Sequence, residues 1–83
     1  MVDYRAVLAR NMKTARKAQG LSQESLSLEV AIDRTYISGI ERGLRNPSLS
    51  LIVRLAECLK CEPADLLQNW SDAGSKPKSQ KND

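Results

Sequence analysis

The stretch Ser22–Arg45, SQESLSLEVAIDRTYISGIERGLR, decides the fold of this chain. Its apolar residues recur at the three- and four-residue spacing of helix faces, on both sides of a short break. Ser27 is small and falls where two crossing helices would touch. The residues that we expect to face inward are Leu26, Val30, Ile32, Ile37 and Ile40. The pattern predicts two short helices joined by a tight turn.

Both helices carry a start signal. Ser22 precedes Gln23, and its hydroxyl can accept hydrogen bonds from the free N–H groups of the first turn. Asp33 does the same ahead of Arg34, where its negative charge also suits the positive end of the helix dipole. Each side chain therefore predicts where a helix begins.

The second helix also carries stop signals. It is expected over Arg34–Arg42 and ends at Gly43, a residue that tolerates a left-handed end cap. The pair Asn46-Pro47 follows and prevents the helix from continuing. Two short crossed helices with these ends form a helix-turn-helix unit, whose second helix enters the major groove of DNA.

A first helix is predicted ahead of this unit, over Tyr4–Gln19. It begins near Asp3 and ends before Gly20. Its apolar positions follow the helical spacing: Tyr4, Val7, Leu8, Met12 and Ala15. The helix is therefore predicted to be amphipathic.

Two more helices are predicted after Pro47. Ser48 or Ser50 can cap a fourth helix, whose inner face carries Ile52, Leu55, Ala56 and Leu59. Glu62 and a proline at the first helical position open a fifth helix, Pro63–Trp70, with Leu66 and Leu67 inward. The chain is therefore expected to be all-α with five helices, as one domain over residues 1–70. The polar segment 71–83 lacks periodicity and is expected to be a disordered tail.

Length, composition and charge narrow the classes of protein. A chain of 83 residues with 41% hydrophobic residues allows one domain with one modest core. No long apolar run suits a membrane, and the polar start at Asp3 does not resemble a signal peptide, so we expect a cytoplasmic protein. Residues 1–45 carry eight Lys/Arg and five Asp/Glu, and this excess of three positive charges equals the net charge of the whole chain, +3. The positive charge thus lies with the helix-turn-helix unit, where phosphates would be met, although a solvated surface would give the same balance.

Residues for catalysis are missing from the sequence. The absence of histidine excludes histidine-based acid–base or nucleophilic chemistry. Cys58 and Cys61 form a CxxC match, but zinc takes four ligands and no second pair follows. We interpret both as thiols of a reducing compartment, with Cys61 as a small core residue. The sequence predicts no enzyme, metal, cofactor or small-molecule ligand.

The segments SQESLSLEV, DRTYISGIERG and RNPSLS resemble the phage-repressor type of helix-turn-helix domain, the lambda repressor/Cro-like, Xre group of bacterial regulators. The resemblance covers about Val7–Leu67. Within it, Asp33–Arg42 followed by Arg45-Asn46-Pro47-Ser48 is most similar to the small controller proteins of restriction–modification systems. It implies a five-helix domain and a homodimer on a partly palindromic operator in double-stranded DNA. It also implies repression or activation, often of the protein's own gene, and activation would make RNA polymerase a partner.

Two positions depart from the family pattern. The family usually has glycine in the turn where this chain has Ala31, and at the end of the fourth helix where it has Lys60. A left-handed Ala31 would cost on the order of 1 kcal/mol. Neither departure touches the helix face that meets DNA.

Five residues of the second helix of the helix-turn-helix unit are candidates for contact with bases. Arg34 can bond guanine O6 and N7 together, and the Thr35 methyl can pack on a thymine methyl. Tyr36 can reach a sugar or base step, or pack on the preceding helix. Ser38 can contact a phosphate or base, or be simply exposed. Gly39 is a poor helix former, which suits either close approach to DNA or close helix packing.

Further residues are candidates for contact with the DNA backbone. In the family the glutamine that opens the second helix binds phosphate, so the resemblance implies this role for Gln23. Arg45, Asn46 and Ser48 occupy the loop that flanks the groove and are carried over as backbone contacts. Arg42 can serve either bases or backbone.

The resemblance also implies an ion pair between Arg16, late in the first helix, and Glu41, late in the second helix of the helix-turn-helix unit, which we call the recognition helix. We expect it to be partly buried and to fix the tilt of that helix; the alternative is two surface charges with weak coupling.

Four apolar residues have no obvious place in so small a core, and we expect them to form a dimer interface: Leu51, Val53, Leu67 and Trp70. Leu51 could instead belong to the core. Leu67 and Trp70 are favoured because the family pairs through its C-terminal helix.

An alternative function keeps the fold but changes the partner. The domain could be an antitoxin-type interaction module that masks a toxin and also binds its own promoter. That function expects a partner-binding segment outside the domain. The only candidate is 71–83, which is short and nearly free of apolar residues.

Overall fold

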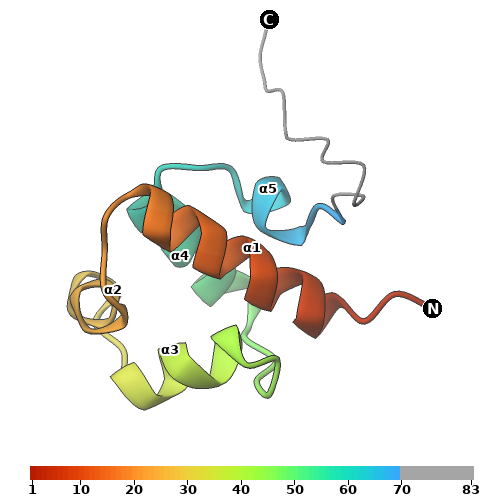
Figure 1. Cartoon of the computed structure of the whole chain (residues 1–83), viewed down its shortest axis with the longest axis horizontal. Helices are drawn as coiled ribbons and strands as arrows, with labels where there is room; N and C mark the ends of the chain where they lie inside the picture. Colours follow the sequence, from red (N-terminus) through yellow and green to blue (C-terminus); the bar gives the residue numbers. More distant parts are fainter. Residues whose placement is uncertain (70–83) are drawn as a thin grey trace, which may run out of the picture.

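The computed structural model describes residues 1–69, which form five α-helices and no strand (Figure 1). The helices are α1 Tyr4–Ala18, α2 Gln23–Val30, α3 Arg34–Glu41, α4 Leu49–Leu59 and α5 Pro63–Leu67. The predicted all-α, five-helix fold is confirmed. The expected tail 71–83 and Trp70 lie outside the described residues.

The N-caps follow the sequence signals. The Ser22 hydroxyl accepts from the Ser25 N–H at 2.9 Å, and the Asp33 carboxylate accepts from the Thr35 N–H at 2.8 Å. For α4 the sequence offered either Ser48 or Ser50 as the N-cap. Ser48 is the cap, and its hydroxyl accepts from the Leu51 N–H at 3.1 Å. These bonds satisfy N–H groups that have no partner within the helix.

The core lies where α1 crosses the other helices. α1 packs against α3 and α5, α2 packs against α3 and α4, and α4 packs against α5. The fully buried side chains come from all five helices: Met12, Leu26, Ile37, Ile40, Leu55, Leu59 and Leu66. The expected inward position of Tyr4 is wrong, because it is the first residue of α1, ahead of the part that packs, and is 54% exposed.

Leu51 and Leu67 were assigned to the dimer interface, although Leu67 was also expected to face inward and Leu51 could instead belong to the core. Both are partly buried and pack against the core. Val53 is 37% exposed, and Leu49, one turn earlier on α4, is 70% exposed. The apolar surface of α4 is thus shifted toward Leu49 and Val53.

A buried amide holds the end of α5. Asn11 on α1 is buried and its Nδ2 donates to the carbonyl oxygens of Asp65, Leu66 and Gln68, at 3.3, 3.0 and 2.8 Å. The last carbonyls of a helix have no intrahelical partner, so this amide supplies one. Gln68 has an extended backbone (φ −74°, ψ 125°), which explains why α5 ends before the predicted Trp70.

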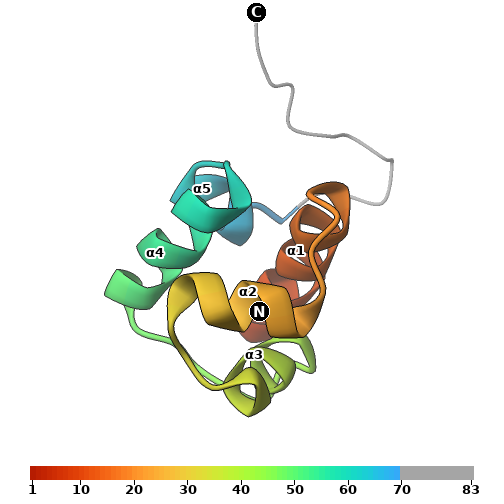
Figure 2. The same cartoon turned by 90° about the vertical axis from the view of Figure 1, so that its left-hand side faces the viewer.

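α3 and α5 lie at opposite ends of the molecule. Figures 1 and 2 both place α3 at the lower end and α5 at the upper end, and Figure 1 shows α1 between them, in contact with both. One side of α3 packs on α1 and α2, and the other forms an outer edge of the domain. No helix in the described part of the chain is long and apolar enough to cross a membrane.

Candidate nucleic-acid interface

The first turn of α3 is presented to solvent by the cap before it. Asp33 accepts from the Thr35 N–H, and the helix then begins at Arg34. Arg34 and Thr35 are exposed, whereas Ile37 further along the same helix is fully buried. The helix dipole disfavours a cation in the first helical turn, so the charge of Arg34 is not stabilised by its own helix.

Tyr36 and Gly39 meet a residue from the following loop. The guanidinium carbon of Arg45 lies 5.3 Å from the centroid of the Tyr36 ring, a cation–π arrangement. Tyr36 itself is partly buried against the core, so one side packs and the other carries the arginine. Gly39 is buried, and a Cβ built on it would lie 2.7 Å from Cγ of Arg45. The sequence left two explanations for this glycine, close approach to DNA and close helix packing. The structure shows close packing, but the packing partner is the loop residue Arg45 and not a second helix.

The remaining candidates surround this helix. Ser38 is partly buried on α3, and Arg42 is the exposed residue that ends it. Asn46 and Ser48 are exposed in the loop, although the Ser48 hydroxyl also caps α4. The structure therefore brings the α3 candidates and the loop candidates to one edge of the domain.

The cations at this edge are free of acidic partners within the described chain. Among residues 1–69 the ion pairs are Arg5 with Asp3 and Arg16 with Glu41, and neither involves Arg34, Arg42 or Arg45. An arginine without a carboxylate partner keeps its donors for an incoming phosphate or base edge.

Gln23 lies behind this edge. Its Nε2 donates to Oε1 of Glu41 at 3.0 Å, and its side chain is partly buried. A primary amide has a second N–H, so Gln23 can serve Glu41 and a phosphate together. This contact joins the start of α2 to the end of α3.

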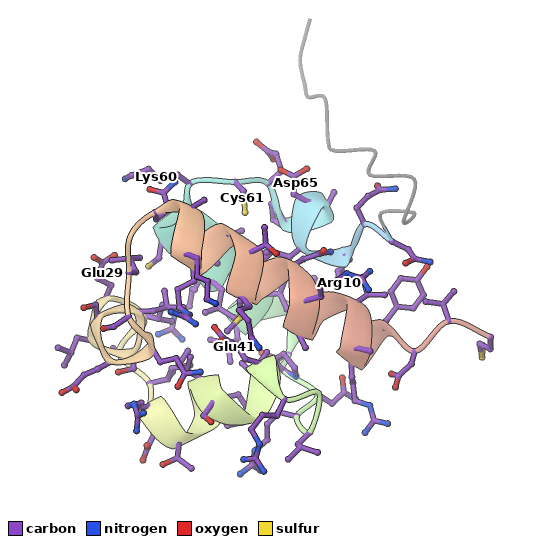
Figure 3. All side chains as sticks on the ribbon, viewed as in Figure 1. Arg10, Glu29, Glu41, Lys60, Cys61 and Asp65 are labelled. Atoms are coloured by element: carbon purple, nitrogen blue, oxygen red, sulfur yellow. The ribbon has the colours of Figure 1, made fainter. Side chains whose placement is uncertain are left out.

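Glu41 is the centre of a buried polar cluster with Arg16. Arg16 Nε donates to Glu41 Oε2 at 2.6 Å, and Arg16 Nη2 donates to Oε1 at 3.0 Å. Figure 3 shows Glu41 between α3 and α1. The ion pair implied by the resemblance is present and is buried, with 11% of the Arg16 side chain and 1% of the Glu41 side chain exposed.

The two cysteines lie away from the α3 edge, at the junction of α4 and α5, where Figure 3 shows Cys61 close to Asp65. Burial, followed by the charges of Asp65 and Glu62, raises the pKa of the Cys61 thiol to about 11. Burial and the Glu29 charge also raise the pKa of Cys58. Both thiols are therefore protonated at neutral pH, whereas nucleophilic attack and metal binding need the thiolate.

Several of these contacts could not be predicted from the residue spacing. The Tyr36–Arg45 stack joins a helix to a loop, and nothing in the residue spacing signals it. Arg54 on α4 donates to the Val30 carbonyl at the end of α2 and was not singled out. Asn11 did leave a signal, because it is a polar residue at helical spacing between Leu8 and Ala15 on the inner face of α1.

Comparison with known proteins assigns the family. The helix-turn-helix family HTH_3 matches residues 12–66. The control protein C.BamHI of Bacillus amyloliquefaciens is 51% identical over 66 residues, which are 78% of this chain and 82% of that protein. A hypothetical transcription factor of Neisseria meningitidis serogroup B is 45% identical over 65 residues, 78% of this chain but 61% of that protein.

A solved structure agrees in fold and sequence. The restriction–modification controller protein C.AhdI from Aeromonas hydrophila superposes with a TM-score of 0.72 at 42% identity, covering 75% of this chain and 94% of that one. The resemblance to helix-turn-helix regulators of the controller type is thereby confirmed. This chain belongs to the HTH_3 family of helix-turn-helix proteins and is a DNA-binding transcription regulator close to the controller proteins of restriction–modification systems.

Proposed function

We propose that this regulator binds a partly palindromic operator as a homodimer, with α3 of each subunit in an adjacent major groove. The observation that carries the proposal is the α3 edge, where Arg34 and Thr35 are exposed in the first turn while Ile37, Ile40 and Glu41 are buried. A helix held on one side by the core and open on the other can enter a groove without rearrangement.

The base-reading roles belong to α3. Arg34 is placed to bond a guanine edge, and Thr35 to pack on a thymine methyl. Tyr36 and Ser38 lie further along the helix and can reach a sugar, phosphate or base. Gly39 was a candidate for close approach to DNA; because it is covered by Arg45, we assign it no direct base contact.

The DNA-backbone roles belong to the residues around α3. Arg42, Arg45 and Asn46 are exposed at the end of the helix and in its loop, and they can meet phosphates on one side of the groove. Ser48 can donate its hydroxyl proton while its oxygen accepts from the Leu51 N–H. Gln23 can reach the phosphate on the other side with its second amide proton.

We propose that residues 1–70 serve dimerisation as well as DNA binding, through α4 and α5. Val53 and Leu49 expose apolar surface on α4, and Leu67 on α5 is only partly buried. Trp70 is assigned to the same interface from the sequence alone. Pairing at this side leaves α3, at the opposite end from α5, open to DNA (Figure 2). Two-fold pairing can place recognition helices about 34 Å apart, one turn of DNA.

The dimer is tested by sedimentation at micromolar protein. We expect the wild type at twice the chain mass. Leu67→Glu should give monomers, but Leu67 touches the core, so Val53→Glu provides a variant with less effect on folding. Leu28→Glu is the matched control, because Leu28 is 75% exposed on α2, outside the interface, and this variant should remain dimeric. A monomeric wild type, free and on DNA, would exclude the dimer.

The similarity to control proteins supports a proposal for the physiological role. We propose that the protein is a cytoplasmic controller of a restriction–modification operon that regulates its own gene, contacting RNA polymerase where it activates. A footprint on the DNA upstream of its own gene tests this role. Protection of two symmetric half-sites supports autoregulation, whereas an unprotected upstream region contradicts it.

A further inference from the structure

Gly39 has no backbone reason to be glycine. Within residues 1–69 the glycines with positive φ are Gly20 and Gly43, so Gly39 has an ordinary helical conformation that any residue could adopt. Glycine is also among the poorest helix formers, so its presence inside an eight-residue helix weakens that helix. A different cause must lie in what surrounds it.

The space above Gly39 is filled by Arg45. A Cβ at position 39 would lie 2.7 Å from Cγ, 3.0 Å from Nε and 3.4 Å from Cδ of that side chain. The Leu44 N–H donates to the Gly39 carbonyl at 2.9 Å, which fixes the chain next to Arg45. Arg45 therefore lies along the bare surface of the helix at Gly39.

The same side chain ends over Tyr36. Tyr36 and Gly39 are three residues apart on α3 and so share one helix face. The Arg45 stem crosses Gly39, and its guanidinium carbon reaches 5.3 Å from the ring centroid of Tyr36. Among residues 1–69 Arg45 forms no ion pair, so the edge of the stacked guanidinium remains available.

We propose that Gly39 is a positioning residue, whose lack of a side chain seats Arg45 on Tyr36 and presets its guanidinium for a phosphate oxygen of DNA. The inference rests on the proposed backbone role of Arg45. Stacking leaves the planar fork of N–H donors free while fixing its direction. A side chain ordered before contact loses less conformational freedom on binding, and this raises affinity.

The competing explanation is that DNA itself approaches Gly39. A double-mutant cycle separates the two, because the positioning role acts only through Arg45. Gly39→Ala should fold normally, since the overlap is with a flexible side chain that can swing away and alanine favours the helix. Its thermal melting temperature should be at least that of the wild type.

The first measurement uses the free protein. In the wild type, NMR should show the Arg45 γ and δ protons shifted upfield by the Tyr36 ring. The shift should disappear in Tyr36→Leu and in Gly39→Ala. Retention of the shift in Gly39→Ala would overturn the positioning role whatever happens with DNA.

The second measurement uses a duplex enriched from a random pool by the wild-type protein. Gly39→Ala should weaken binding about three- to tenfold, the scale of ordering one long side chain on binding. In an Arg45→Ala background the same change should have no further effect. Arg45→Lys keeps the charge but not the planar stack, and should weaken binding as Gly39→Ala does.

The outcomes distinguish this inference from the function on which it rests. Equal weakening by Gly39→Ala in both backgrounds would mean that DNA meets Gly39 directly, and would overturn the inference. Wild-type affinity in Arg45→Ala would also overturn it while leaving DNA binding intact. Failure of the wild type to enrich any duplex would instead refute the proposed function, and the NMR shift would still decide whether Gly39 seats Arg45.

Discussion

Arg16 and Glu41 are joined side by side through two hydrogen bonds, of 2.6 and 3.0 Å, although they belong to α1 and α3. Arg16 Nη1 also donates to the Leu21 carbonyl at 2.8 Å, and Gln23 donates to Glu41 at 3.0 Å. One buried cluster therefore connects the end of α1, the start of α2 and the end of the recognition helix. We infer that it sets the tilt of α3 against the rest of the domain.

Arg16→Met should lower the free energy of unfolding by about 3–5 kcal/mol, because it leaves the Glu41 charge buried without its partner. The double variant Arg16→Met with Glu41→Leu should recover much of that loss, since no isolated charge remains. Denaturant unfolding of the four proteins of this cycle measures the coupling.

An exposed pair provides the control for that cycle. Arg5 and Asp3 lie 3.6 Å apart with side chains 55% and 60% exposed, and Arg5→Met should change stability by less than about 1 kcal/mol. If the Arg16–Glu41 coupling is equally small, the cluster does not hold α3 in place.

Ala31 and Lys60 have left-handed backbones, with φ of 65° and 60°. Glycine adopts this conformation without strain, so Ala31→Gly and Lys60→Gly should each stabilise the protein by about 0.5–1 kcal/mol, after the added freedom of the unfolded chain is counted. Ala6→Gly, at an exposed helical position, should instead destabilise it by about 1 kcal/mol. Melting curves compare the three; a loss of stability in both left-handed variants would contradict the strain.

The sequence predicts the parts of this molecule that depend on neighbours along the chain. Ser22 and Asp33 mark helix starts because a cap bonds an N–H two or three residues away. The end of α5 could not be found in this way, because it depends on Asn11, more than fifty residues earlier. Local periodicity extends the helix toward Trp70, whereas a tertiary contact ends it.

The candidate site shows the same difference between features set by neighbouring residues and features set by tertiary contacts. Arg34 and Thr35 could be placed because a cap fixes where α3 begins. Gly39 could not be explained, because its partner Arg45 reaches it through the fold of a loop. Leu67 was expected both to face inward and to join the dimer interface, because helix spacing alone does not show how far α5 tilts toward α4.

Cys61 should make stability depend on pH in alkaline solution. Its pKa is about 11 in the folded protein, against 9.0 for an ordinary thiol, so above pH 9 the unfolded chain loses this proton first. The free energy of unfolding should therefore fall between pH 9 and pH 11, relative to a Cys61→Ala variant in which this group is missing. Unfolding curves of the wild type and of Cys61→Ala across that range measure the difference in their free energies of unfolding. A difference that does not change with pH would contradict a buried neutral thiol at Cys61.

The proposed recognition of DNA sequence depends most on α3, and Arg34→Ala tests this role directly. Affinities of the wild type and the variant are measured for the selected duplex and for a scrambled duplex at one salt concentration. We expect the wild type to prefer the selected duplex and Arg34→Ala to lose about 1–3 kcal/mol of that preference, while binding to scrambled DNA changes less. An equal loss on both duplexes would make Arg34 a phosphate contact, and equal wild-type affinity for both would contradict sequence recognition by α3.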